Sequence, residues 1–177
     1  MAEIDSVLPM IASFSQELSQ PEYIHVLLNP LPIYGLTMGI IALALALTLR
    51  SRPAQVVALS LILVSGAIAF PVIHYGEEGY DRVLSMTDEQ GEAWLKVHQH
   101  RGDQLGWAFY LLAGLAVIAI AAPFKWPRSA FALTIITLLF SFCVLGIGGY
   151  IAYAGGKVRH REFRSSPAPP VPVELEE

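Results

Sequence analysis

The sequence has few charged residues and a single cysteine. Charged residues make up 15% of its 177 positions, whereas hydrophobic residues make up 54%. Soluble domains usually carry about 25% charged residues, so a soluble enzyme core is not expected. The one cysteine, Cys143, has no partner within the chain, which excludes an internal disulfide bond. The net charge is −4 and no block of basic residues occurs, so nucleic acid is not expected as a partner.

Sequence motifs typical of enzymes are also missing. The chain has no phosphate-binding glycine loop, no zinc-protease motif and no serine nucleophile elbow. The first thirty residues hold no lysine or arginine, so the basic segment that opens a cleavable signal peptide is missing. We therefore expect the N-terminus to stay on the mature protein, and we find no indication of an enzyme.

Long apolar runs are the main feature that the sequence does contain. Four of them occur, at about 31–49, 53–73, 105–122 and 129–154. Each is close to the roughly 20 residues that a helix needs to cross a hydrocarbon core. The short connections within the first and second pairs predict antiparallel neighbours. The fold class predicted is all-α, an integral membrane four-helix bundle built from two transmembrane hairpins.

Charged and titratable residues divide the predicted bundle into two sides. Side A carries the two short turns at 49–53 and 122–129, and side B carries the N-terminus, the loop at 75–104 and the C-terminal tail. All five histidines and all fifteen carboxylate side chains fall on side B. Residues that bear chemistry are therefore gathered at one face of the membrane.

Basic residues in the side A turns suggest an orientation. These residues are Arg50, Arg52, Lys125 and Arg128. Because basic residues favour the cytoplasmic side, their density places side A in the cytoplasm of a bacterial inner membrane and both termini in the periplasm. Side B has more basic residues in total, which favours the reverse.

The flanking segments differ in composition from the four runs. Residues 1–24 show apolar positions at helical spacing, which predicts a short amphipathic helix in the membrane interface. Residues 25–162 hold the four-helix domain, and the proline-rich acidic segment 163–177 is predicted to be disordered. Gly76 and Gly79 are expected to break the second helix and Gly155-Gly156 the fourth. Thr87 with Gln90 predicts a capping box at the start of a further helix.

Four histidines are expected at one membrane level, because each stands beside the side B end of a span. They are His25, His74, His98 and His160. Neutral imidazole is a common ligand for haem iron, and helix bundles can present such ligands inward. Their matching places in the two hairpins suggest the pairs His25 with His98 and His74 with His160, enough for one or two b-type haems. Arg101 and Arg159 could then pair with haem propionates.

Other interpretations of these histidines stay open. The same four side chains could bind zinc or copper. They could also serve only as hydrogen-bonding residues of the headgroup zone, in a structural or accessory subunit without a cofactor. His100 faces about 160° away from His98 on a helix and is not expected to share its site. Covalent c-type haem is excluded, because no Cys-x-x-Cys-His segment exists. The partners expected are the lipid bilayer and either a membrane redox protein or a second copy of the chain.

Three segments resemble a bacterial membrane family known as domain of unknown function 2231. The segment 25–33, His-Val-Leu-Leu-Asn-Pro-Leu-Pro-Ile, is similar to the family's His-Pro-Leu-Leu-Val-His-Phe-Pro-Ile. His98 corresponds to a family histidine before the third span, and the segment 155–162 resembles the closing motif with its Arg159-His160 pair. The resemblance implies four helices and a histidine-bearing face, and members are sometimes suspected of binding haem. Pro30 replaces the second family histidine, which makes His74 the substitute candidate.

Overall fold

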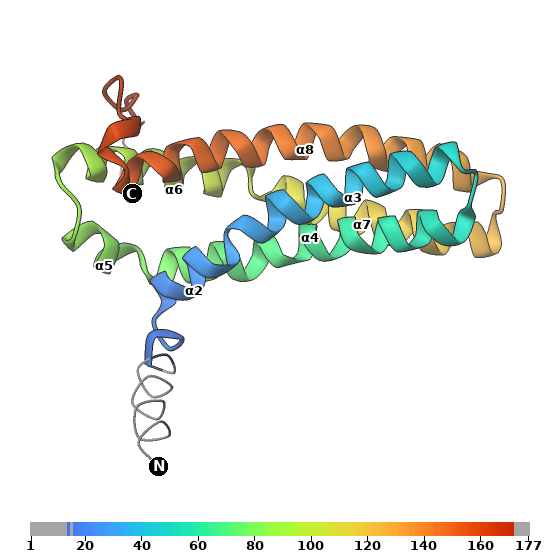
Figure 1. Cartoon of the computed structure of the whole chain (residues 1–177), viewed down its shortest axis with the longest axis horizontal. Coiled ribbons are helices and arrows are strands. Elements are labelled where there is room, and N and C mark those ends of the chain that lie inside the picture. The colour runs from blue at the N-terminus through green and yellow to red at the C-terminus, as the bar shows by residue number, and fades with distance from the viewer. Residues whose placement is uncertain (1–13, 15, 172–177) are drawn as a thin grey trace, which may run out of the picture.

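A computed structural model of the chain describes residue 14 and residues 16–171 (Figure 1). The predicted amphipathic segment lies mostly outside this part, as do the last six residues. The described residues are helical, without strands, and form the following elements: α2 (Pro21–Leu28), α3 (Pro30–Thr48), α4 (Arg52–Glu78), α5 (Tyr80–Ser85), α6 (Glu89–Leu105), α7 (Trp107–Lys125), α8 (Ser129–Arg159) and the 3-10 helix η1 (Arg161–Phe163).

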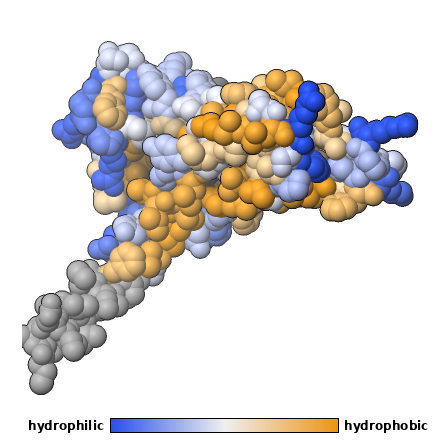
Figure 2. Space-filling view, turned by 45° about the vertical axis from the view of Figure 1, so that its right-hand side comes forward, coloured by the Kyte–Doolittle hydropathy of each residue, from blue (hydrophilic) through white to orange (hydrophobic). Residues whose placement is uncertain are grey.

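Four helical segments are long and apolar enough to cross a membrane. They are Pro21–Thr48, Arg52–Glu78, Glu89–Lys125 and Ser129–Arg159. Hydrophobic residues cover the middle of the molecule and hydrophilic residues gather towards its ends (Figure 2). The prediction of an all-α four-helix membrane bundle is therefore confirmed. The segments are longer than the apolar runs mainly because each helix continues on side B past the end of its apolar run.

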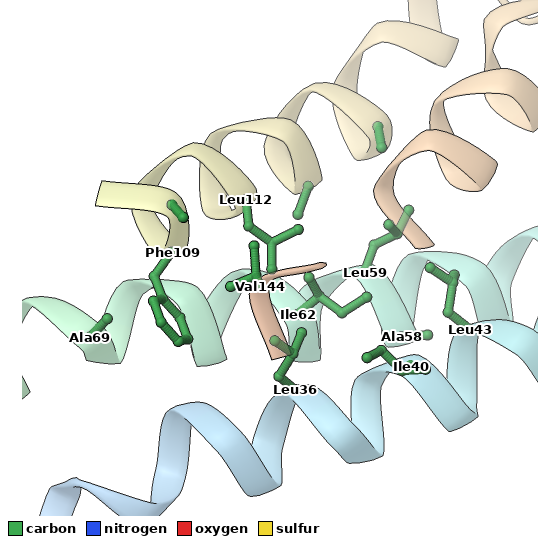
Figure 3. Close-up of a cluster of buried hydrophobic side chains, with 13 residues drawn as sticks. Leu36, Ile40, Leu43, Ala58, Leu59, Ile62, Ala69, Phe109, Leu112 and Val144 are labelled. Carbon is green, nitrogen blue, oxygen red and sulfur yellow. The ribbon is translucent and has the colours of Figure 1, made fainter. Parts of the chain in front are cut away.

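Helices α3, α4, α7 and α8 form a closed ring. α3 contacts α4, α4 contacts α7, α7 contacts α8, and α8 contacts α3. Large buried side chains from all four helices meet in the shared core (Figure 3). Among them are Leu36, Ile40, Leu43, Leu59, Ile62, Phe109, Leu112 and Val144. This core fixes the positions of the helix ends on both sides.

Glycines allow the helices of this ring to approach closely. A Cβ atom at Gly39 would lie 2.7 Å from the side chain of Ile62, and one at Gly66 would lie 2.7 Å from the Phe109 carbonyl oxygen. Real Cβ atoms do not come so near, so larger residues would push the helices apart. Small residues in these stripes therefore serve backbone packing, as is usual where lipid provides no hydrophobic drive between helices.

At the side A end, an arginine completes the hydrogen bonding of a neighbouring helix. Pro123 lies inside α7 and has no N–H to donate to Ala119, four residues earlier. Arg52, from the start of α4, donates from Nη2 to the Ala119 carbonyl oxygen at 2.7 Å. Its Nη1 also approaches Gln55 and Thr134, each at 3.4 Å. This contact joins the two hairpins at their side A ends.

At the side B end, two shorter helices extend the bundle. α2 continues α3 and packs on α4, whereas α6 continues α7 and packs on α8. The first joint lies at Pro30, which cannot donate a helical hydrogen bond, and the second lies at Gly106. α5 connects the two halves at this end (Figure 1). The result is one helix pair on each side of the bundle axis, α2 with α4 and α6 with α8.

Helix ends on side B agree with the sequence-based prediction at Gly79, which caps α4, and differ from it in two respects. α4 continues through Gly76 to Glu78, and α8 continues through Gly155 and Gly156 to Arg159. The residue that caps α6 is Asp88 rather than Thr87, since the Asp88 carboxylate accepts from the backbone N–H of Gly91 at 2.8 Å. Glycine is tolerated inside these helices because tertiary packing, described below, makes use of the missing side chain.

The described part of the C-terminal tail packs against the bundle, where the sequence predicted disorder. Arg164 donates from Nη1 to both carboxylate oxygens of Asp88, at 2.7 and 2.9 Å, and from Nε to the Lys157 carbonyl oxygen at 2.6 Å. Ala168 and Val171 contact the apolar cluster between α6 and α8. One buried guanidinium thus ties the end of α8 to the start of α6 and holds the tail in place.

Candidate functional site

His25 lies on α2 and contacts the side B end of α4. Its Nδ1–H donates to the Val72 carbonyl oxygen over 2.7 Å. The ring lies against Gly76, where an added Cβ atom would be 2.8 Å from Nδ1. Since the carbonyl can only accept, Nδ1 carries a proton, and in the neutral ring Nε2 keeps its lone pair. The α2–α4 contact therefore fixes both the tautomer and the orientation of this imidazole.

His98 lies on α6 and makes the same arrangement with α8. Its Nδ1–H donates to the Ile151 carbonyl oxygen over 3.0 Å. The ring lies against Gly155, where an added Cβ atom would be 3.0 Å from Cε1 and 3.1 Å from Nδ1. In the neutral ring, Nε2 is again the nitrogen that keeps a lone pair. Both histidines thus donate from Nδ1 to a backbone carbonyl oxygen.

The same local arrangement holds both rings, and each is called a histidine seat: Gly76 with the Val72 carbonyl for His25, and Gly155 with the Ile151 carbonyl for His98. In each, the accepting carbonyl belongs to the residue four positions before the glycine that receives the ring, Val72 before Gly76 and Ile151 before Gly155. A side chain at the glycine position would cover this carbonyl, because residues four apart are neighbours on a helix face. The glycine therefore serves both to admit the ring and to expose its hydrogen-bond acceptor. The two halves of the bundle carry equivalent seats.

The two rings come together across the space between the hairpins. Their centroids lie 6.1 Å apart and their planes are inclined at 77°. The residues are 73 positions apart in the sequence, and His25 belongs to α2 whereas His98 belongs to α6. The packing of the four-helix core brings them to the same place.

Both rings line a cavity of about 480 Å³ between the two helix pairs of side B. Its inner wall is mainly apolar and includes Ile33, Ala69 and Phe109. Polar residues occur around it, from both halves of the chain: Glu22, Tyr23, Asn29, Tyr75, Glu77, Gln99, Asp103 and Arg159. Glu22 is paired with Arg82 at 2.8 Å. The cavity falls within the range of about 300–1,000 Å³ that is common for small-molecule and cofactor sites.

The structure places His74 and His160 outside this cavity, each with a local partner. His74 is half-exposed on α4, stacks on Phe70 and lies 3.4 Å from Glu78. His160 follows the end of α8, stacks on Phe163 and donates from Nδ1 to Glu162 over 2.9 Å. The backbone N–H of Glu162 and this His160 contact hold the pKa of the Glu162 carboxyl below its usual value. The structure therefore brings His25 and His98 together, and shows no contact between His74 and His160.

The two arginines proposed for propionates lie in different surroundings. Arg159 lines the histidine cavity. Arg101 is buried on another face of α6, donates to the Tyr150 carbonyl oxygen at 2.8 Å and covers the Tyr150 ring at 3.6 Å. It lines a second cavity that has no residue in common with the first. His100 also lines the second cavity, in keeping with its expected separation from His98.

The donor set limits which ions the site could hold. Within the part of the chain that the structure describes, no three His, Cys, Asp or Glu side chains are grouped so as to bind a metal ion. Structural zinc usually takes four protein ligands and catalytic zinc three. Haem iron needs only axial ligands from the protein, since the macrocycle provides the other donors. Two imidazoles facing one cavity therefore fit haem better than a bare zinc ion.

Sequence reasoning identified both histidines but missed the groups that hold them. These are the carbonyls of Val72 and Ile151 and the glycines at 76 and 155. A signal was present, since each histidine that precedes a hairpin is matched by a glycine near the hairpin's end. Both glycines were interpreted as helix breakers instead.

Comparisons with known proteins give no relative for this chain. No protein-family description, curated protein or solved structure matches it.

Proposed function

We propose that the histidine cavity binds one b-type haem, which His25 and His98 would hold through their ring nitrogens, and that the protein transfers electrons near side B of its membrane. The observation that carries this proposal is the pair of imidazoles, 6.1 Å apart, whose Nδ1 atoms are both committed to backbone carbonyls. An Nδ1–H bond to a carbonyl is the usual way in which proteins orient an imidazole that ligates through Nε2.

The distance between the two imidazole rings also suits a shared metal atom. A metal bound to histidine lies about 2 Å from the ligating nitrogen, so two imidazoles that hold one metal atom have their ring centroids within roughly 6 Å of each other. The centroid separation of His25 and His98 is close to this value. The spacing of the two rings is therefore compatible with one shared metal atom.

Each group around the cavity has a role in this proposal. When bound, haem supplies one-electron redox chemistry. The apolar wall, including Ile33 and Phe109, excludes water from the macrocycle. Arg159 offers a forked cationic donor to a propionate. The seats at Gly76 and Gly155 hold the imidazoles in place, so the ligands are oriented before the cofactor arrives.

The wider assignment follows the sequence. We place the protein in a bacterial inner membrane with side B in the periplasm, on the basis of the basic residues in the side A turns. A redox protein of the same membrane is the partner that electron transfer would require.

The rival function is a structural or accessory subunit without a cofactor. In that case the hydrogen bonds of His25 and His98 would serve only to join α2 to α4 and α6 to α8. Bound zinc or copper is a further alternative, for which the described residues offer two imidazoles but no third ligand grouped with them. The optical spectrum and the metal content of the purified protein separate these possibilities.

The test is the absorption spectrum of the full chain, purified in detergent from haem-replete cells. We expect a Soret band that is lost in His25→Ala and in His98→Ala, because either change removes an axial ligand. His74→Ala and His160→Ala are matched controls and should keep the band. A colourless protein with bound zinc or copper would favour the bare metal, and a colourless protein without metal would favour the accessory subunit.

A further inference from the structure

A buried cation without a carboxylate partner lies outside the histidine cavity. The Arg101 side chain is 8% exposed, and no ion pair joins it to a carboxylate among residues 14 and 16–171. Its contacts are the Tyr150 carbonyl oxygen, which accepts from Nη1, and the face of the Tyr150 ring. A guanidinium has five N–H donors, so most of its hydrogen-bonding capacity is left for a ligand. A buried charge is costly unless it is paired.

This arginine lines a cavity of about 220 Å³ between α6, α8 and the C-terminal tail. The lining residues are Val97, His100, Arg101, Gln104, Leu105, Tyr150, Pro169, Pro170 and Val171. None of them is acidic, whereas the histidine cavity has three carboxylates around it. The polar side chains of the smaller cavity are those of Arg101, His100, Gln104 and Tyr150, all of which can donate hydrogen bonds. Its chemistry therefore suits a small anion.

A second buried cation, Lys157, adds to the positive potential between α6 and α8, a contact called the α6–α8 seam below. Lys157 is 2% exposed and lies two helical turns from Tyr150 on α8. Its Nζ lies 4.4 Å from the Trp94 ring centroid and 4.3 Å from that of Tyr153, and it has no hydrogen-bond partner among the described residues. Both cations of the α6–α8 seam therefore lie on aromatic faces, without a carboxylate partner within residues 14 and 16–171. An anion bound beside Arg101 would be attracted by both.

The cavity lies where the polar helix α6 passes into the apolar helix α7, which we take as the membrane boundary of side B. Leu105 and Tyr150 stand where α6 and α8 enter the apolar part of the bundle, and Trp107 is exposed just beyond them. Tryptophan and tyrosine are typical of membrane–water interfaces. An anion at this depth can be attached to acyl chains that continue along the bundle surface. Basic pockets beside transmembrane helices are known to bind acidic lipid headgroups.

We propose that this cavity binds a phosphate group, supplied by an anionic phospholipid such as phosphatidylglycerol. Arg101 provides the forked donor to the phosphate oxygens, and His100 and Gln104 donate beside it. A zwitterionic headgroup binds less well, because its ammonium group would enter a cavity that holds no carboxylate. The site shares no lining residue with the histidine cavity, so it does not depend on haem binding.

The test is native mass spectrometry of the full chain in a neutral detergent, titrated with three probes. They are dioleoylphosphatidylglycerol, dioleoylphosphatidylcholine and glycerol 3-phosphate. We expect phosphatidylglycerol to bind most tightly. In Arg101→Gln its affinity should fall about tenfold, in line with the loss of charged hydrogen bonds. Lys96→Gln makes the same change of charge on the same helix but at an exposed position, and it should leave the affinity unchanged.

Three results would overturn the proposal. Equal binding of phosphatidylglycerol and phosphatidylcholine would remove the preference for an anion. Binding of glycerol 3-phosphate as tightly as the lipid would make a soluble phosphate the ligand. Equal losses in Arg101→Gln and Lys96→Gln would show a general effect of charge. If Arg101→Gln does not fold, Gln104→Glu leaves the arginine in place and should abolish binding by adding a carboxylate to the lining.

Discussion

The two ends of the bundle use similar helices for different purposes. At side A the hairpins end in short turns, and Arg52 donates to the α7 carbonyl that Pro123 leaves without a helical partner. At side B the helix pairs enclose a cavity of about 480 Å³ that both His25 and His98 line, with their rings 6.1 Å apart. The Arg52 guanidinium at the first end is bonded to groups of the protein itself. At the second end, Nε2 of His25 and of His98 has no hydrogen bond within residues 14 and 16–171, where both rings are held through Nδ1.

One structural device appears both in the core and at the side B end. In the core, Gly39 receives the side chain of Ile62, which brings α3 and α4 together. At side B, Gly76 receives the ring of His25 and Gly155 the ring of His98. A glycine facing a neighbouring helix therefore gives tight packing when the incoming side chain is aliphatic. It gives an oriented ligand when that side chain is an imidazole.

The largest effect on stability is expected from a substitution in the hydrophobic core, which lies away from the histidine cavity and should leave cofactor binding unchanged. Leu112 is fully buried, so Leu112→Ala should lower the free energy of unfolding by about 2–5 kcal/mol. Leu111→Ala removes the same atoms from a side chain that is 53% exposed and should cost much less. Unfolding in detergent, followed by circular dichroism, measures both. Equal losses would contradict the packing described for this core.

A substitution of Gly155 at side B should show whether the orientation of the His98 ring depends on this glycine, separately from the packing of the bundle. A valine at Gly155 would crowd the His98 ring and move it from the Ile151 carbonyl, at a cost of about 1–3 kcal/mol. The proposed Soret band should be lost with it. Gly149→Val is the control, since a Cβ atom there meets nothing within 4 Å. An unchanged spectrum in Gly155→Val would mean that the seat does not orient a ligand.

At side A, loss of the arginine contact should lower stability without changing the spectrum. Arg52→Gln leaves the Ala119 carbonyl oxygen without its donor, and an unsatisfied buried acceptor costs about 1–3 kcal/mol. Arg50→Gln, at an exposed position of the same turn, is the control. Thermal unfolding and the absorption spectrum should be recorded together. A spectral change in Arg52→Gln would show that the two ends are not independent.

The smallest effect concerns the contact between Asp88 and Arg164 at side B. The Gly91 N–H and the Arg164 guanidinium hold the pKa of Asp88 below its ordinary value of 3.8. The carboxylate therefore adds stability above pH 3.8, and this contribution is lost as the pH falls through the lower pKa of the folded protein. Melting temperatures measured from neutral pH to below 3.8 should fall more steeply for wild type than for Asp88→Asn. Parallel curves would exclude this source of acid sensitivity.

The fold was predictable because burial in lipid needs long apolar runs, and these are visible without tertiary contacts. The meeting of His25 and His98 was also predicted, since both stand before the first helix of a hairpin. The predicted pair of His74 and His160 is not observed, since each ring contacts a carboxylate near it in the sequence, Glu78 and Glu162 respectively. The directions in which these two rings point depend on tertiary packing, which the sequence does not show.

The glycines and the tail show what the sequence alone could not decide. Gly76 and Gly155 are residues typical of helix ends. The helices continue through them because the rings of His25 and His98 pack against these glycines, which only the structure shows. In the tail, Arg164 lies in a polar, proline-rich segment, and its two partners come from distant parts of the chain. Contacts between such distant residues depend on the three-dimensional arrangement of helix ends.

The central claim is that one cofactor lies between His25 and His98, and the haem content of purified protein tests it most directly. The pyridine haemochrome assay should give one haem per chain for wild type and for the His74→Ala/His160→Ala double variant. It should give none for the His25→Ala/His98→Ala double variant. Two haems per wild-type chain, or loss of haem in the first double variant with retention in the second, would contradict the account.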